Sequence, residues 1–380
     1  TYPHCWRTDK PVLYYPLDSW FIRTTALKDR MAELNRTINW KPESTGTGRF
    51  GNWLENLVDW NLSRSRYWGT PLPIWRTKDG KEEKCIGSVD ELREEVIKAV
   101  NAGIPNPSPD VLKHENIRLL DLHRPFVDEW VLVSNSGKPM YREPDLVDVW
   151  FDSGAMPYAQ WGLDPVLLKQ NHPQPFHDGW KGAFPADFIS EGVDQTRGWF
   201  FTLHALAVLL YDSVAFKNVI STGLLLDKDG NKMSKRLGNV INPFDTLARY
   251  GPDAVRWYMV ENAPPWENLK FNLAGVEEVQ RKFFGTLFNT YAFFALYANI
   301  DGYVKDEKNN SPQEALTLLD RWILSRLQEL IQTVTEAYND YEPTRAARAI
   351  QEFVCDHLSN WYVRLNRKRF WQPASRGELS

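Results

Sequence analysis

The sequence predicts an α/β domain followed by an all-α region, and two observations support this prediction. Strand-like and helix-like segments alternate as far as about residue 226, a pattern typical of a parallel sheet with helices on its faces. From about residue 240 onward the strand signal fades, and long segments with helical spacing of apolar residues take over. The chain of 380 residues has room for two or three domains.

The first 75 residues alternate short apolar runs with Pro and Gly breaks. Apolar residues at helical spacing predict helices, and short apolar runs between Pro and Gly predict strands. We expect strands over 18–23 and 70–75, and helices over 27–34 and 50–62.

Residues 76–147 have a different character and are predicted to be an insertion packed on the main sheet. Thr77–Lys81 is typical of a hairpin turn. Ser88 with Glu91 three residues later is a capping-box pattern, which predicts a helix from Ser88 to Ala102. A loop rich in Pro and Asn is expected over 103–117.

After residue 148 the βαβ pattern returns, and it then gives way to helices. The predicted strands cover 186–190 and 218–226, with a long apolar helix over 194–210 between them. Three further helices, over 276–299, 312–338 and 343–371, predict a bundle at the C-terminal end.

Composition narrows the class of protein. The net charge of -4 argues against a protein that coats nucleic acid non-specifically, although a local basic face can still bind RNA. The 3 cysteines are far apart and no apolar run reaches about 18 residues, so we expect a cytoplasmic protein without disulfides or a membrane span. Because the chain opens with Thr1 rather than Met, we expect a segment of a longer protein.

A cluster of basic residues follows the strand expected over 218–226. Lys232, Lys235 and Arg236 lie within five residues of one another, with Ser234 between the lysines and glycines on both sides. Such a run alone is typical of a solvated turn. A loop of this kind can also close over a triphosphate and place positive charge on the leaving oxygens.

Carboxylates gather where the strand over 186–190 ends and the next helix begins. Ligands of open α/β sheets bind at this edge, against helix N-termini. Glu191 and Asp194 can bind a ribose hydroxyl or an ammonium group, and Gly192 lets a ligand approach the backbone. Asp194 alone could be a simple helix cap, but a cap does not account for Glu191 and Gln195 as well.

Four motifs in this chain resemble those of class I aminoacyl-tRNA synthetases. Residues 232–236 are similar to the KMSKS loop, with Arg236 in place of the last Ser, and 191–200 resemble the G-x-D-Q segment of isoleucyl-tRNA synthetases. Residues 148–154 are similar to the W-F-D-S-G motif of the isoleucine, valine and leucine enzymes. Residues 60–71, with 3–7, resemble the junctions around their editing insertion.

The resemblance implies roles for particular residues. Lys232 and Lys235 would be catalytic and would bind ATP together with Ser234, and Trp150 and Trp199 would form the amino-acid pocket. The aminoacyl-adenylate would be held by Glu191, Gly192, Asp194 and Gln195, and tRNA by Arg364, Arg367, Lys368 and Arg369. The basic stripe is otherwise typical of a solvated helix face. The implied partners are isoleucine, ATP with Mg2+ and tRNA(Ile), and the complete protein is expected to be a monomer.

The family also implies a domain organisation. Residues 1–226 would be the C-terminal half of the Rossmann-type catalytic domain, 227–300 the KMSKS loop and a connecting helical region, and 301–380 the start of the anticodon-binding bundle. The H-I-G-H motif of the family is missing from this sequence, so we expect this segment to be inactive by itself. Thr8 replaces a cysteine of many relatives, and we expect no metal site and no zinc.

Two alternatives remain at this point. Valyl-tRNA synthetases share the W-F-D-S-G motif, although Asp-Gln-Thr-Arg-Gly-Trp-Phe at 194–200 and Leu-Ser-Asn-Trp-Tyr at 358–362 favour isoleucine. The second alternative is a non-catalytic module of the same fold that binds tRNA or protein. The intact residues at 191–195 and 232–236 argue against it.

Overall fold

The computed structural model describes residues 2–5, 8–113, 116, 120–160, 183–234, 238–304 and 316–371. The chain forms two compact units. The first comprises Thr1–Asn39, Glu43–Ile189 and Asp194–Asn218, and the second comprises Trp40–Pro42, Ser190–Val193 and Val219–Ser380. A sheet with the order β10-β11-β2 contributes residues to both, because the division passes through its strands β10 (Ala186–Gly192), β11 (Phe216–Thr222) and β2 (Asn39–Lys41).

Short elements begin the first unit. Helix α1 (Lys28–Asn35) forms where it is predicted, and the strand expected over 18–23 is reduced to β1 (Phe21–Ile22), which pairs antiparallel with β3 (Trp60–Asn61). The helix predicted over 50–62 is wrong in its second half, because α2 (Gly51–Glu55) ends before the strand begins. The spacing of apolar residues did not distinguish one long helix from a short helix followed by a turn and a strand, because both bury the same side chains.

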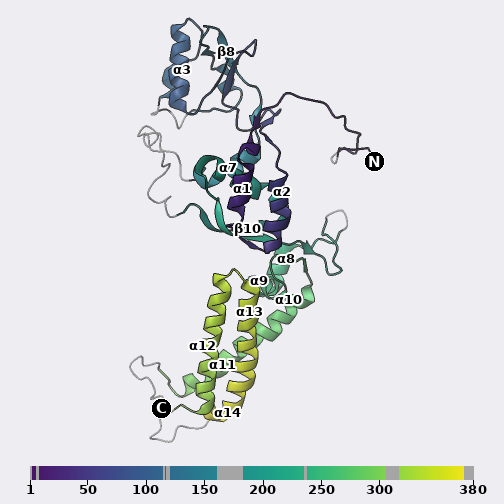
Figure 1. Cartoon of the computed structure of the whole chain (residues 1–380). Helices are drawn as coiled ribbons and strands as arrows, with labels where there is room; N and C mark the ends of the chain where they lie inside the picture. Colours follow the sequence, from purple (N-terminus) through teal and green to yellow (C-terminus); the bar gives the residue numbers. More distant parts are fainter. Residues whose placement is uncertain are drawn as a thin grey trace. The chain divides into compact units, whose positions relative to one another are not determined.

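The predicted insertion forms a small sheet with its own core. Its antiparallel strands β5 (Ile74–Thr77), β6 (Glu83–Cys85), β7 (Leu132–Val133) and β8 (Pro139–Arg142) have the order β6-β5-β8-β7. Helix α3 (Val89–Asn101) covers one face (Figure 1), and buried side chains of both fill the space between them. The predicted hairpin turn is confirmed, with Gly80 at a φ of 66°. So is the predicted cap, because Ser88 accepts the N–H of Glu91 at 3.1 Å.

A narrow neck joins this insertion to the rest of the first unit. Strand β4 (Ser63–Arg64) leads into it and β9 (Leu146–Val147) leads out, and the two pair antiparallel. Two short helices, α4 (Val149–Gly154) and α5 (Met156–Ala159), follow directly. The neck therefore carries the chain straight into the W-F-D-S-G segment.

Strands β10 and β11 are neighbours joined by helix α7 (Trp199–Tyr211), so the predicted βαβ alternation is confirmed. Nine consecutive residues of α7 are buried, which is typical of a helix covered on all sides. The predicted helix over 194–210 starts as a 3-10 turn, Val193–Arg197, and the α-helix begins only after Gly198.

The strand predicted over 218–226 is interrupted at Gly223. A Cβ atom at this position would lie 2.3 Å from the carbonyl oxygen of Glu267, so no side chain fits there. The chain leaves β11 at this point and continues as β12 (Leu225–Leu226), which pairs parallel with β13 (Leu269–Lys270). The basic loop therefore follows a separate two-stranded parallel sheet, β12-β13, and not strand β11.

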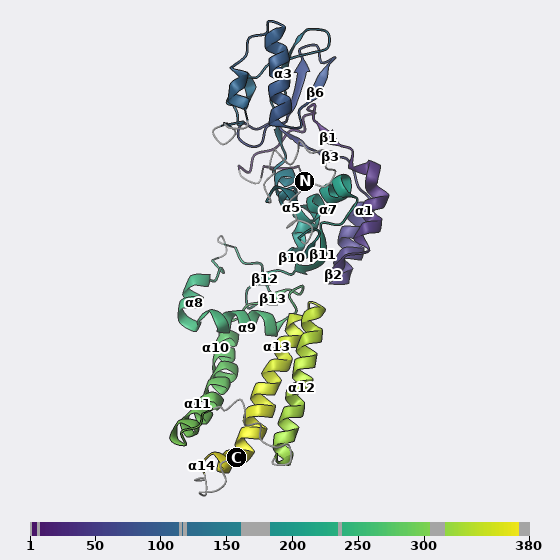
Figure 2. The ribbon, with the colours of Figure 1, turned by 90° about the vertical axis from the view of Figure 1, so that its left-hand side faces the viewer.

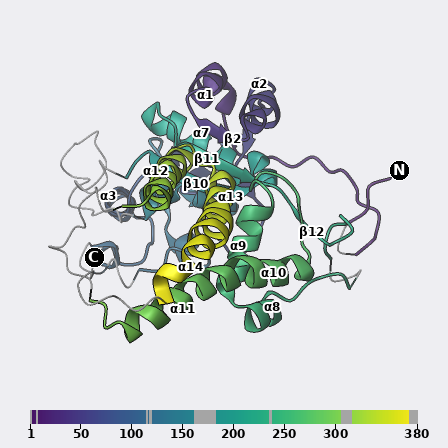
Figure 3. The ribbon, with the colours of Figure 1, turned by 90° about the horizontal axis from the view of Figure 1, so that it is seen from below.

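Helices make up most of the second unit. They are α8 (Pro243–Tyr250), α9 (Pro252–Asn262), α10 (Leu273–Val279), α11 (Gly285–Ile300), α12 (Leu318–Asn339), α13 (Pro343–Glu352) and α14 (Arg364–Trp371). A π-helical turn carries α10 into α11 (Figure 3), and a longer π-helical segment, Phe353–Val363, joins α13 to α14. Helix α12 packs along α13 (Figure 2).

The three helices predicted near the C-terminal end are thus present, and the predicted fold class, α/β followed by all-α, is confirmed. The buried side chains of Phe283, Ile323, Phe353 and Val354 form the centre of the bundle. Among the residues that the structure describes, no helix is long and apolar enough to span a bilayer.

Candidate functional site

Asp148 organises the W-F-D-S-G segment in the first unit. Its side chain is buried, and Oδ1 accepts the backbone N–H of Trp150 at 3.3 Å, capping α4. Oδ2 accepts the indole Nε1–H of Trp60 at 3.1 Å and an Arg64 guanidinium N–H at 2.7 Å. One carboxylate therefore ties α4 to β3 and β4. The sequence analysis missed this role, although an Asp before a short helix is a recognisable cap.

A cavity of about 230 Å³ opens beside Asp148. Its lining combines aromatic and aliphatic side chains with the charged side chains of Asp59, Arg64, Asp148 and Arg197. Lining residues include Trp53, Trp60, Arg64, Asp148, Trp150 and Phe201. Trp150 therefore lines a cavity, and its predicted role in an amino-acid pocket stays a prediction.

The start of α7 brings three further candidates together. Gly198 caps this helix without a side chain, and Gln195 supplies the acceptor instead, because its Oε1 binds the N–H of Trp199 at 3.1 Å. The Nε2 of Gln195 donates to Asp194 at 3.1 Å. A Cβ at Gly198 would lie 2.9 Å from the Gln195 amide oxygen and 3.2 Å from the Trp150 ring, so a larger residue would displace the Gln195 amide.

Trp199 has a second anchor. Its indole Nε1–H donates to the carbonyl oxygen of Ser153 at 3.0 Å, which joins the first turn of α7 to α4. Trp199 is half-buried at this junction, whereas Trp150 faces the cavity directly. The two tryptophans that the sequence analysis paired therefore belong to the same helix junction.

Glu191 and Gly192 end strand β10, in the part of the chain that belongs to the second unit. The neighbouring Ser190 hydroxyl donates to the carbonyl oxygen of Ile220 at 3.2 Å, which fixes the strand end on β11. The Glu191 side chain is exposed. It is therefore accessible to a ligand at the end of the strand.

Asn239 holds the described part of the basic loop. Its Oδ1 accepts the N–H of Ser234 at 2.9 Å, and its Nδ2 donates to Asp227 at 2.9 Å and to the carbonyl oxygen of Lys232 at 3.3 Å. Asp227 also accepts the N–H groups of Asp229 and Asn231, and the bond from Asn239 leads the interactions that lower the pKa of this carboxyl. Lys232 is exposed, and Lys235 and Arg236 lie outside the described residues.

The sequence analysis assigned no role to the Gly238-Asn239 pair at the end of the loop. The structure shows that Asn239 binds the backbone of two of the predicted ATP-binding residues. A Gly-Asn pair directly after a basic run, with an Asp before it, is the signal that could have identified this bond.

The basic stripe of α14 divides into two parts. Arg364, Arg367 and Lys368 are exposed, and none of them has an ion pair within the part of the chain that the structure describes. Arg369 instead donates to the buried Asp320 at 2.7 Å, and Tyr362 donates to the same oxygen at 2.7 Å. Arg369 therefore joins α14 to α12, whereas the first three charges are available to a ligand.

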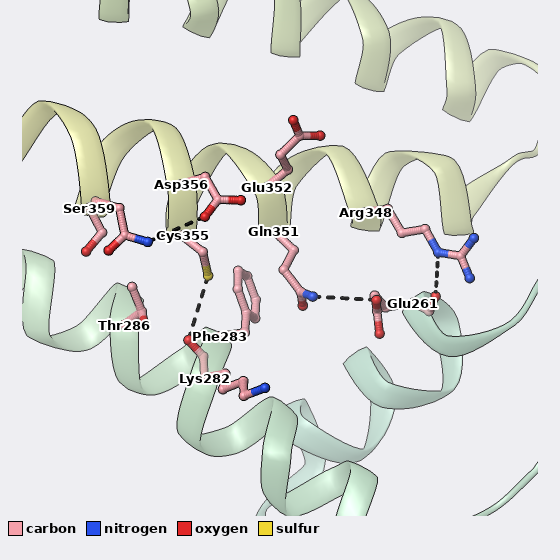
Figure 4. A pocket seen from close by; sticks show the side chains of 11 residues that line it. Glu261, Lys282, Phe283, Thr286, Arg348, Gln351, Glu352, Cys355, Asp356 and Ser359 are labelled. Atoms are coloured by element: carbon pink, nitrogen blue, oxygen red, sulfur yellow. Dashed lines mark hydrogen bonds between the residues drawn. The ribbon is translucent and has the colours of Figure 1, made fainter.

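A second cavity, of about 480 Å³, lies in the bundle between α9, α11 and the segment that follows α13 (Figure 4). Its polar groups mostly bind one another. Arg348 donates to the carbonyl oxygen of Glu261 at 2.9 Å, and Asn360 donates to Asp356 at 3.4 Å. Burial leads the causes that raise the pKa of the Cys355 thiol. The Arg348 bond joins α13 to α9, whereas the Asn360 bond lies within one helical segment, and the two do not converge on a common point.

Metal-ligating residues do not cluster in the ranges that the structure describes. No group of three or more His, Cys, Asp or Glu side chains there could hold a metal ion.

Comparisons with known proteins show which family the chain belongs to. Residues 9–272 match the family model of tRNA synthetases class I (I, L, M and V), and residues 320–378 match that of the anticodon-binding domain of tRNA ligase. The chain is 68% identical over 98% of its length to the isoleucine–tRNA ligase of Cytophaga hutchinsonii. It is 63% identical over 97% to that of Bacteroides fragilis. In each case it spans 32% of the relative, about a third of that protein's length.

Two solved structures share the fold at low sequence identity. A methionyl-tRNA synthetase of Mycobacterium tuberculosis in complex with methionyl-adenylate gives a TM-score of 0.61 at 17% identity, covering 97% of this chain and 57% of that one. The LeuRS of a ternary complex from Agrobacterium radiobacter gives 0.55 at 19% identity, covering 91% and 40%. With a family model matched over most of its length and the fold of its structural neighbours, the chain belongs to the class I tRNA synthetases of the isoleucine, leucine, methionine and valine group.

Proposed function

We propose that the chain is part of an isoleucine–tRNA ligase, which activates isoleucine with ATP and transfers it to tRNA(Ile). The observation that supports this best is the 68% identity over 98% of the chain to a relative with that name. The aromatic and aliphatic part of the pocket beside Asp148 also supports it, because such a wall suits a branched aliphatic side chain.

In this proposal the isoleucine carboxylate attacks the α-phosphate of ATP, and pyrophosphate leaves. No protein nucleophile takes part, so the residues supply position and charge. Lys232 and Lys235 stabilise the leaving pyrophosphate with Ser234, and Mg2+ enters with the nucleotide as part of the substrate. Asn239 holds the backbone of Lys232 and Ser234 and thereby orients the start of the loop.

The adenylate and the amino acid are assigned to the ends of β10 and α7. Glu191, Gly192 and Asp194 bind the adenylate, and Gln195 keeps the Asp194 carboxylate oriented through a hydrogen bond of 3.1 Å. Trp150 contacts the aliphatic side chain, and Trp199 secures the junction behind it.

The tRNA contacts of the bundle are assigned to the exposed charges of α14. Arg364, Arg367 and Lys368 neutralise phosphates. Arg369, which the sequence analysis grouped with them, holds Asp320 and contributes to the fold of the same surface.

Isoleucine-dependent exchange of pyrophosphate into ATP by the complete protein encoded by this gene tests the proposal. We expect exchange with isoleucine and much weaker exchange with valine. Lys235→Ala and Glu191→Ala should each lower it at least tenfold, and Lys228→Ala, a neighbouring lysine outside the motif, should not. Equal or better exchange with valine would favour the valyl alternative. Absence of exchange with any amino acid would favour a binding module.

We further propose that the 380-residue chain is inactive by itself, because its sequence contains no H-x-G-H motif. Exchange activity of the purified chain would contradict this.

A further inference from the structure

Lys270 brings a lysine from a distant part of the chain to the base of the basic loop. It lies on β13 in register with Leu226 of β12, and Leu226 also forms an antiparallel bridge with Lys232. Residues that are paired across neighbouring strands point to the same face of a sheet, and two strand spacings correspond to roughly 10 Å. The side chains of Lys232 and Lys270 therefore leave the same face, with Leu226 between them.

The turn at the start of the loop packs on the Lys270 side chain. Gly230 in this turn has a φ of 89°. A Cβ atom at Gly230 would lie 3.1 Å from the Cε of Lys270 and 3.5 Å from its Nζ. The positive φ and the close contact together favour glycine at this position. The turn therefore passes directly beside the Lys270 ammonium group.

The backbone around Lys270 is held from two directions. The N–H of Phe271 donates to the carbonyl oxygen of Leu226 at 2.9 Å, which continues the pairing of β12 with β13. The hydroxyl of Tyr258 donates to the carbonyl oxygen of Lys270 at 3.1 Å, and the Tyr258 ring is buried against the ring of Phe271. Lys270 thus belongs to a fixed part of the second unit, whereas Lys232 belongs to the loop.

The lysines around this turn lack ion pairs. Lys228, Lys232 and Lys270 are exposed, and none of them forms an ion pair with another residue in the described ranges. The carboxylate of Asp227 in the same turn instead accepts the amide of Asn239 and N–H groups of the turn. Exposed cations without ion pairs attract an anion with several charges, and lysine is a common ligand of phosphate groups.

We propose that Lys270 is a further phosphate-binding residue of the ligase site and that it binds the triphosphate of ATP together with Lys232. The proposal rests on the proposed function for the identity of the nucleotide. A cation on a fixed strand holds the phosphates in place while the loop closes, so the triphosphate is bound by one stationary and one mobile charge. Lys270 forms no covalent bond and transfers no proton in this role.

The first test measures pyrophosphate exchange by the complete protein. Lys270→Met retains most of the aliphatic stem and removes the charge, and we expect it to raise the KM for ATP about fivefold or more without changing the KM for isoleucine. Lys270→Arg keeps the charge and should recover most of the ATP affinity. Lys228→Met, at another exposed lysine of the same turn, is the matched control and should change neither constant. An unchanged KM for ATP in Lys270→Met would overturn the proposal.

The melting temperature separates the charge of Lys270 from the packing of its stem. It should stay the same in Lys270→Met, because the stem of methionine can still pack on Gly230. If Lys270→Met and Lys270→Arg lower both the exchange rate and the melting temperature to the same extent, Lys270 supports the fold and the proposal is refuted.

The second test separates this proposal from the proposed function. Isothermal titration of the complete protein with ATP, in the absence of isoleucine, measures nucleotide binding without the reaction. If the unaltered protein binds ATP but shows no exchange with any amino acid, the ligase function fails, and weaker binding by Lys270→Met still supports the role of Lys270. If exchange is normal and Lys270→Met binds ATP as tightly as the unaltered protein, only the role of Lys270 fails. If the unaltered protein binds no ATP, both proposals fail.

Discussion

Asn239 and Asp227 close the base of the basic loop through a hydrogen bond of 2.9 Å from the amide to the carboxylate. The same amide binds the backbone of Ser234 and Lys232, so three interactions depend on one side chain. We predict that Asn239→Ala loosens the loop and speeds its cleavage by trypsin several-fold, because the lysines become easier to fit into the protease. In the complete protein, pyrophosphate exchange should fall about tenfold.

A matched control and a reversal variant are available for this pair. Asn231→Ala removes only a marginal bond of 3.4 Å to Asp227 and should leave both measurements nearly unchanged. The double variant Asp227→Asn with Asn239→Asp exchanges donor and acceptor, and it should recover much of the protection. Unaltered cleavage and exchange in Asn239→Ala would show that the loop does not need this bond.

Asp148 is expected to be a major stabilising residue of the first unit. Asp148→Ala leaves the Trp60 indole without its acceptor and removes the cap of α4. We expect a loss of about 2–3 kcal/mol in the free energy of unfolding, because hydrogen bonds to a charged group contribute this much. The Arg64 side chain is partly exposed, so water replaces much of its bond to Asp148. Urea denaturation followed by tryptophan fluorescence measures it.

The control for this change is Ser65→Ala, which removes an exposed hydrogen bond of 3.0 Å to Asp145 in the same neck. It should cost well under 1 kcal/mol. If the two variants unfold at the same urea concentration, Asp148 does not organise this junction.

Protonation of His204 should destabilise the first unit at mildly acidic pH. Burial lowers the pKa of this histidine from 6.5 to about 4, and its Nε2 lies 2.8 Å from the carbonyl oxygen of Met31. The unfolded chain therefore takes up the proton first as the pH falls. Stability should be greatest above pH 6.5 and should decrease by roughly 3 kcal/mol as the pH falls to about 4.

Urea denaturation at several pH values between 7 and 4 measures this slope. His204→Gln removes the titrating group, so its stability should depend less on pH in this window, although it is lower overall. His123→Asn, at an exposed histidine, should retain the full slope. The same slope in His204→Gln and the unaltered chain would exclude this assignment.

Asp320 should make the bundle sensitive to stronger acid. Burial by itself would raise the pKa of this carboxyl, but hydrogen bonds from Arg369, Tyr362 and Thr317 outweigh burial and hold it well below the usual value. The stabilisation is complete above the ordinary value of 3.8 and is lost as the pH falls below it. Thermal unfolding of Asp320→Asn should begin at a lower temperature at pH 7 and should change less between pH 4 and 2.5.

The exposed charges of α14 and Arg369 should behave differently. We expect Arg364→Ala, Arg367→Ala and Lys368→Ala each to weaken tRNA binding modestly and to reduce the slope of log K against log salt by about 1. Arg369→Ala should mainly lower the melting temperature, because it breaks the bond of 2.7 Å to Asp320. Filter binding at several salt concentrations distinguishes the two effects, and an unchanged slope in all three variants would remove these residues from the tRNA surface.

Much of the fold could be predicted from periodicity and caps. The helix after Ser88, the βαβ order around α7 and the helices of the bundle follow local patterns that tertiary contacts did not override. The prediction failed where apolar spacing was ambiguous, at Trp60, and where a close backbone approach ended a strand, at Gly223. In the candidate site, charged and aromatic motif residues were visible in the sequence, but Asp148 and Asn239 act on groups far away in the chain or on backbone atoms. The spacing of residues in the sequence does not indicate the hydrogen-bond partners of Asp148 or Asn239.

The neck of the insertion offers a route for protein engineering. Ser63 and Arg64 face Val147 and Leu146 in one antiparallel pair, so the strand ends lie close enough for a two-residue turn such as Asn-Gly to join them. The excised module has its own hydrophobic centre, so its core is removed with it. A trimmed chain of this kind would show whether nature added the module to an already complete scaffold.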